Sequence, residues 1–98
     1  MSNVQSHRSL QLEITESGDG TIAVLLTGNS TQSQRVTYEL KTSGASISTH
    51  KGTTTLRALE PTMLSNVRFS AGNQWCVSLD VEEDNGEHYT ITDGSGCH

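Results

Sequence analysis

The chain has 98 residues, a formal net charge of −5 and a hydrophobic content of 32%. This length is enough for one domain and not for two, and the acidic charge argues against a nucleic-acid partner, which requires a basic surface. No segment has the roughly 20 apolar residues of a membrane-spanning helix, so we expect no membrane insertion.

The first third of the chain predicts a tail and two strands. Residues 1–9 are polar and predict a flexible N-terminal tail, followed by a single domain over residues 10–98. Apolar residues at every second position predict a strand with one buried face over residues 10–15. After a turn signal at residues 17–20, residues 21–27 are apolar on both faces and predict a more buried strand.

The middle third predicts strands whose hydrophobic patterns differ in strength. Residues 35–42 alternate between apolar and polar side chains and predict a third strand. Residues 45–50 contain one large apolar residue, Ile47, which is typical of an edge strand or an irregular crossing. Residues 53–59 predict another short strand, which ends before Pro61.

The last third predicts a strand over residues 63–70 and then a hairpin with strands at residues 74–83 and 87–92. Its three-residue loop, Asp84 to Gly86, has glycine where a left-handed residue is needed. The expected register places apolar residues on one face. It sets Val81 opposite Tyr89 and Leu79 opposite Ile91.

Seven to eight antiparallel strands in one short chain predict an all-β fold, an immunoglobulin-like antiparallel β-sandwich, with a small closed barrel as the alternative. The predicted core collects inward-facing residues from several strands. They are Trp75, Val77, Leu79, Val81, Val24, Tyr38, Phe69 and Ile91.

Cys76 and Cys97 are the two cysteines of the chain. The hairpin register places Cys76 opposite Gly94, and the glycine-rich segment 93–96 can return Cys97 to it. We favour a disulfide, which would contribute roughly 3 kcal/mol by loop entropy and indicate an oxidising compartment. The alternative is two unrelated thiols.

No pattern for catalysis, a cofactor or a metal is present. Nucleophile-elbow, phosphate-loop and dinucleotide motifs are absent, so no catalytic residue is assigned and we expect no enzyme and no cofactor. The histidines are not at zinc-ligand spacing, and surface positions are favoured over a metal site built from Cys97 and two of them. They are His7, His50, His88 and His98.

Charge is unevenly distributed along the chain. The segment from Arg35 to Arg68 has five basic and two acidic residues, a net charge of +3, whereas the remainder has one basic and nine acidic residues, a net charge of −8. The simpler interpretation is solubility, and the more specific one is a basic strip that steers an acidic or polar partner.

The size, strand order and Ser/Thr-rich character resemble the CsgC/CsgH family of periplasmic curli proteins, over about residues 10–91. The resemblance is carried by the opening strand Leu10 to Ile14, by Thr31 to Ser33 and by the hairpin from Val77 to Tyr89. Residues 34–36 have no counterpart of the Cys-x-Cys pair of CsgC, so a thiol-redox activity does not carry over and the chain looks more like the CsgH branch.

The resemblance implies a monomeric periplasmic chaperone whose signal peptide has been removed, and which transiently binds a curli-type amyloid subunit to inhibit premature polymerisation. Such a protein needs a charged surface or edge that meets growing β oligomers without extending them. We predict the outward row of the third strand as this charged edge and contact: Arg35, Thr37, Glu39 and Lys41. The alternatives are a structural or adhesion module of a bacterial surface assembly and a small secreted hydrolase inhibitor.

Overall fold

A computed structural model describes residues 8–97, and residues 1–7 of the predicted tail lie outside the described range. Seven strands form in chain order: β1 (Leu10–Glu16), β2 (Thr21–Gly28), β3 (Gln34–Ser43), β4 (Ile47–Leu56), β5 (Thr62–Ser70), β6 (Cys76–Glu83) and β7 (His88–Asp93). No helix in this range is long and apolar enough to cross a membrane.

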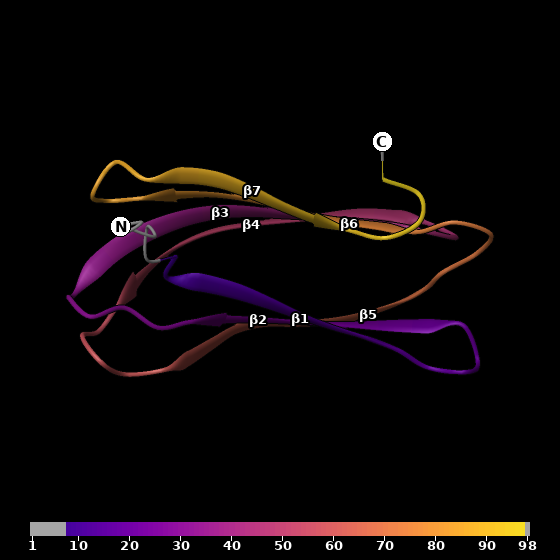
Figure 1. Ribbon diagram of the computed structural model, residues 1–98, viewed down its shortest axis with the longest axis horizontal. Helices are drawn as coiled ribbons and strands as arrows, with labels where there is room; N and C mark the ends of the chain where they lie inside the picture. The colour runs from indigo at the N-terminus through magenta and orange to yellow at the C-terminus, as the bar shows by residue number, and fades with distance from the viewer. Residues whose placement is uncertain (1–7, 98) are drawn as a thin grey trace, which may run out of the picture.

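The strands form two antiparallel sheets that face each other as the layers of a sandwich (Figure 1). One sheet has three strands in the order β1-β2-β5, and the other has four in the order β4-β3-β6-β7. The predicted sandwich is confirmed, and the closed barrel is excluded because no ladder joins the two sheets within residues 8–97.

The core lies between the sheets and follows the period-two alternation of the strands. Val24, Val77, Leu79 and Val81 are completely buried, as predicted. The other four predicted core residues are partly buried and pack against this core: Tyr38, Phe69, Trp75 and Ile91. The β6–β7 register is the predicted one.

Two segments differ from the prediction. Residues 45–50, predicted as an edge strand or an irregular crossing, and the strand predicted at residues 53–59 are parts of one continuous edge strand, β4, because Gly52 stays paired with Tyr38 of β3. The chain leaves this strand after Leu56, and Leu59 then adopts a left-handed backbone angle φ of 60°.

The domain also begins before residue 10. Ser9, which was predicted to belong to the tail, is only 1% exposed and bonds to Glu83. Arg8 lies with its guanidinium 4.8 Å from the centre of the Tyr89 ring. The residues directly before β1 are therefore part of the packed structure.

Candidate interaction surface

The outer face of the four-stranded sheet is polar except at Ile47, the first residue of β4, which is 79% exposed. Alternation along each strand turns the buried residues toward the core and a second set toward solvent. This second set, here called the outer face, comprises Ile47, Thr49, Lys51, Thr53, Thr55, Arg35, Thr37, Glu39, Lys41, Ser78, Asp80, Glu82, His88, Thr90 and Thr92. A face with a single exposed apolar side chain can remain in water or bind a polar partner, and it is not built to pack in a core.

The four residues predicted as the contact all lie on this face, but their strand is not an edge. β3 is paired on one side with β4 and on the other with β6. Its backbone donors and acceptors are therefore used within the sheet, and the prediction of a charged edge at β3 is wrong for a topological reason. Any contact by Arg35, Thr37, Glu39 and Lys41 must be made through their side chains.

Basic and acidic residues occupy neighbouring strands of the outer face. β3 and β4 carry three basic side chains and Glu39, whereas β6 carries Asp80 and Glu82. Lys51 Nζ lies 4.0 Å from Glu39 Oε2, and the Lys51 side chain is 74% exposed. An ion pair this open contributes little to stability, so its charges are available to a partner.

Asp80 is the most constrained charge of the outer face. Its Oδ1 accepts a hydrogen bond from Thr90 Oγ1 at 2.9 Å and lies 2.9 Å from His88 Nε2. The Thr90 bond, followed by the His88 contact, lowers the pKa of the Asp80 carboxyl below its ordinary value. This carboxylate stays ionised at neutral pH.

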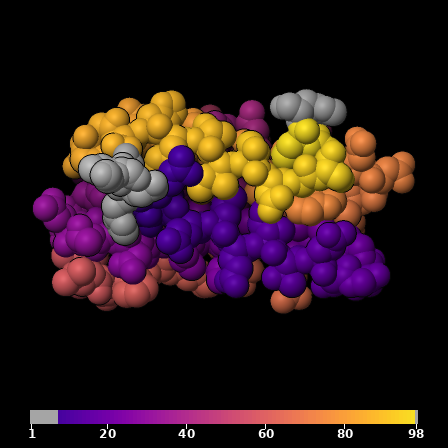
Figure 2. All heavy atoms as spheres, viewed as in Figure 1, coloured from indigo at the N-terminus to yellow at the C-terminus, as the bar shows by residue number. Residues whose placement is uncertain are grey.

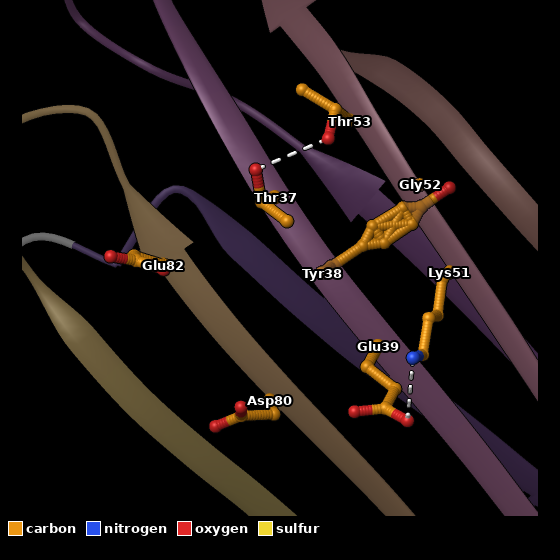
Figure 3. A pocket seen from close by; sticks show the side chains of 8 residues that line it. All are labelled: Thr37, Tyr38, Glu39, Lys51, Gly52, Thr53, Asp80 and Glu82. Carbon is orange, nitrogen blue, oxygen red and sulfur yellow. Dashed lines mark hydrogen bonds and ion pairs between the residues drawn. The ribbon is translucent and has the colours of Figure 1, made fainter.

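A shallow hollow of about 430 Å³ opens across three neighbouring strands, β4, β3 and β6 (Figure 3). It is lined by Thr37, Tyr38, Glu39, Lys51, Gly52, Thr53, Asp80 and Glu82. The Tyr38 ring lies across Gly52, where a Cβ atom would be 2.8 Å from the Tyr38 hydroxyl oxygen. An aromatic ring thus fills the space left by an edge glycine.

The structure contains the predicted disulfide between Cys76 and Cys97, with a Cα–Cα distance of 4.9 Å. The loop returns because Gly94 has φ 133° and the Gly96 N–H donates to the Trp75 carbonyl at 2.8 Å. A side chain at Gly94 would collide with the Trp75 carbonyl oxygen. The glycines of this loop are therefore required for the return of Cys97.

A buried polar cluster around Glu83 was not predicted. The Glu83 side chain is nearly inaccessible at 3% exposure, and its carboxylate accepts hydrogen bonds from four groups. The donors are Ser9 N at 2.9 Å, Ser9 Oγ at 3.1 Å, Gln34 Nε2 at 3.3 Å and the Tyr89 hydroxyl at 2.6 Å.

The Tyr89 hydroxyl connects this cluster to β1. It accepts a bond from the Leu10 N–H at 3.2 Å while it donates to Glu83. Burial and the bond to Glu83 raise the pKa of the Tyr89 hydroxyl. Alternation along β6 places Glu83 inward after Val81, and that was the signal for its burial.

No group of three His, Cys, Asp or Glu side chains suited to a metal ion occurs in residues 8–97. His50 and His88 are exposed on β4 and β7, and His7 and His98 lie outside the described residues.

The two facing sheets define a small immunoglobulin-like sandwich, and solved structures with a similar fold are known. The fold is similar to that of the E. coli curli protein CsgC, with a TM-score of 0.59, 18% identity, and coverage of 91% of this chain and 98% of that chain. It is also similar to that of R. palustris CsgH, with a TM-score of 0.55, 20% identity, and coverage of 86% of this chain and 88% of that chain. No family model and no curated protein sequence matches the chain.

Proposed function

We propose that this domain is a periplasmic chaperone that binds a curli-type subunit transiently and inhibits its premature polymerisation into amyloid. The observation that carries the proposal is the structural similarity to the curli protein CsgC, which extends over 91% of this chain. The sequence resemblance to the CsgC/CsgH family points to the same role, and the Cys76–Cys97 disulfide is compatible with an oxidising compartment.

The physical basis of the proposed activity is a folded β surface that meets a polar amyloid-forming chain. The outer face offers Arg35, Lys41 and Lys51 beside the acidic residues of β6, so it can attract either sign of charge at close range. Because Ile47 is the one apolar side chain on this face among residues 8–97, binding is expected to be weak and reversible. That suits a protein that must release its client.

A fibre-growth assay tests the proposal. The curli major subunit is incubated in large excess over this protein, and thioflavin fluorescence follows the lag time, with an unrelated disulfide-bonded sandwich domain as control. We expect this protein, and not the control, to lengthen the lag. An unchanged lag would refute the chaperone role.

The contribution of the predicted contact residues is tested by the variant with Arg35→Glu and Lys41→Glu. Both side chains are exposed on a central strand, so the fold should tolerate the change. We expect weaker inhibition, and a smaller effect of salt than in the parent, because exposed charges are screened over about 8 Å at physiological ionic strength. Full inhibition by the folded variant would exclude these two charges from the contact.

A further inference from the structure

We infer that the free edge of β4 pairs by strand addition with an extended client segment that is polar on both faces. This inference rests on the proposed function and identifies the part of the molecule that would carry it out. It replaces the predicted edge at β3, which the sheet order places between β4 and β6.

The sandwich has four edge strands, β1, β5, β4 and β7, and three of them are interrupted or protected. β7 has six residues and leads directly into the disulfide loop. The pairing of β5 with β2 shifts register between Leu26 and Thr27. β1 carries Glu13 and Glu16, and its first residue is held by Tyr89. Short length, irregular pairing and charge are the usual means of blocking strand addition.

β4 has few of these protections. It is ten residues long, pairs with β3 at every position without a register shift, and contains no proline. Its fixed charge is Lys51 alone. Backbone groups on its outer side therefore remain available along a regular strand, which is the template that an added strand requires.

The side chains of β4 define the chemistry of the partner. The outer-face residues of β4 are threonines, Lys51 and, at the start of the strand, the exposed Ile47. The residues on the other side include Ser48, His50 and Thr54, which are exposed or half-buried. Except at its two end residues, Ile47 and Leu56, β4 would thus present polar side chains to both faces of a neighbouring strand. A Ser-, Thr-, Asn- or Gln-rich segment fits this environment, whereas an amphipathic strand would leave its apolar face in water.

Gly52 provides an attachment point in the middle of this edge. It presents no side chain, and the Tyr38 ring lies against it in Figure 3. The Tyr38 hydroxyl makes no hydrogen bond to any residue within 8–97. It is therefore free to bond to an incoming backbone or amide side chain.

The addition of a client strand at β4 would stop the growth of the amyloid fibre instead of propagating it. A client segment bound there lies against a folded sheet whose opposite edge, β7, is short and leads into a disulfide-closed loop. One bound molecule would thereby block one growing end. Since growing ends and early oligomers are few, a small amount of protein could delay a large excess of subunit.

The test compares two variants with the same added charge at opposite edges of the four-stranded sheet. Thr54→Lys places a lysine on β4, and Thr92→Lys places one on β7, where the side chain is exposed. Both are checked for folding by circular dichroism, and His50→Lys replaces Thr54→Lys if that variant is unfolded. In the fibre assay we expect the β4 variant to need about tenfold more protein for the same lag, a loss of about 1.4 kcal/mol in binding, and the β7 variant to match the parent.

Equal inhibition by both variants would overturn the edge assignment and leave the chaperone role intact, whereas failure of the parent to delay fibres would refute the chaperone role itself. Hydrogen exchange gives an independent measurement. With excess curli major subunit, amides of β4 should exchange about tenfold more slowly and those of β7 at an unchanged rate. Unchanged exchange throughout β4 would also overturn the inference.

Discussion

Replacing Tyr89 by phenylalanine should destabilise the domain far more than the same replacement at Tyr38. Each change removes one oxygen atom and leaves the ring in place. The Tyr89 hydroxyl donates to the buried Glu83 carboxylate at 2.6 Å and accepts from the Leu10 N–H. The Tyr38 hydroxyl has no hydrogen-bond partner among the described residues, so this pair of variants isolates the bonds from the loss of the atom.

The expected magnitude follows from the two bonds lost at Tyr89. A hydrogen bond to a charged group contributes about 1.5–3 kcal/mol, and a buried N–H left without a partner costs about 1–3 kcal/mol. Leu10 is completely buried, so water cannot readily replace the hydroxyl. Tyr89→Phe should therefore lower the free energy of unfolding by about 2.5–6 kcal/mol and the Tm by at least roughly 10 °C. Tyr38→Phe should change the free energy by less than about 0.5 kcal/mol.

Urea unfolding followed by the fluorescence of Trp75, with the disulfide intact, measures both variants. Equal m-values in parent and variants would show that the comparison concerns the folded state and not the compactness of the unfolded chain. If Tyr89→Phe cost no more than Tyr38→Phe, the cluster around Glu83 would not hold β1 to the sandwich, and the reasoning would be refuted.

Two further outcomes are expected. Replacing Cys76 and Cys97 by serine should reduce stability by about 3 kcal/mol, measured by urea unfolding, and the native parent should show no thiol to an alkylating reagent; two reactive thiols would contradict the disulfide. Thr90→Val removes the largest cause of the lowered Asp80 pKa, so a carboxyl NMR titration should find that pKa closer to its ordinary value. A carboxyl group whose pKa is lowered in the folded state stabilises the fold at pH values above its unfolded pKa of 3.8, and this stabilisation is lost as the pH falls. The variant should therefore lose less stability than the parent on acidification. An unchanged Asp80 titration would disprove the role of Thr90.

The parts of the fold that depend on local pattern were predictable from the sequence. Alternation located most strands, and the three-residue loop from Asp84 to Gly86 determined the register of the β6–β7 hairpin. The same register brings Cys76 close to the glycine-rich segment, so local pattern is sufficient to predict the disulfide with Cys97.

The parts that depend on contacts between distant segments were not predictable. An isolated glycine favours a break in a strand, but Tyr38 covers Gly52 and β4 continues through it. The order of strands in a sheet also depends on contacts between distant segments. The alternation of β3 therefore predicted its polar face, but not that β4 and β6 pair with it on either side. By residue type alone Glu83 belongs with the solvated acidic residues of the hairpin, although its position in the alternation of β6 points inward.

The interactions that stabilise the domain and the edge proposed to bind the client lie on opposite sides of the four-stranded sheet. Figure 2 shows β1 and the C-terminal residues together on one flank, where Tyr89 contacts Leu10. β4 is three strand spacings away from β7 in the sheet order, roughly 14 Å. Effects at such a distance are expected to be additive.

Stability and inhibition should therefore be separable by mutation. At a temperature where it remains folded, Tyr89→Phe should lengthen the lag of fibre growth as much as the parent does, although its unfolding midpoint is lower. Thr54→Lys should show the reverse, near-parental stability with weakened inhibition. The double variant should combine the two losses without further coupling, since β3 and β6 separate β4 from β7 in the sheet. A Tyr89→Phe variant that is folded but inactive would show that the β1/β7 flank, and not the β4 edge, meets the client.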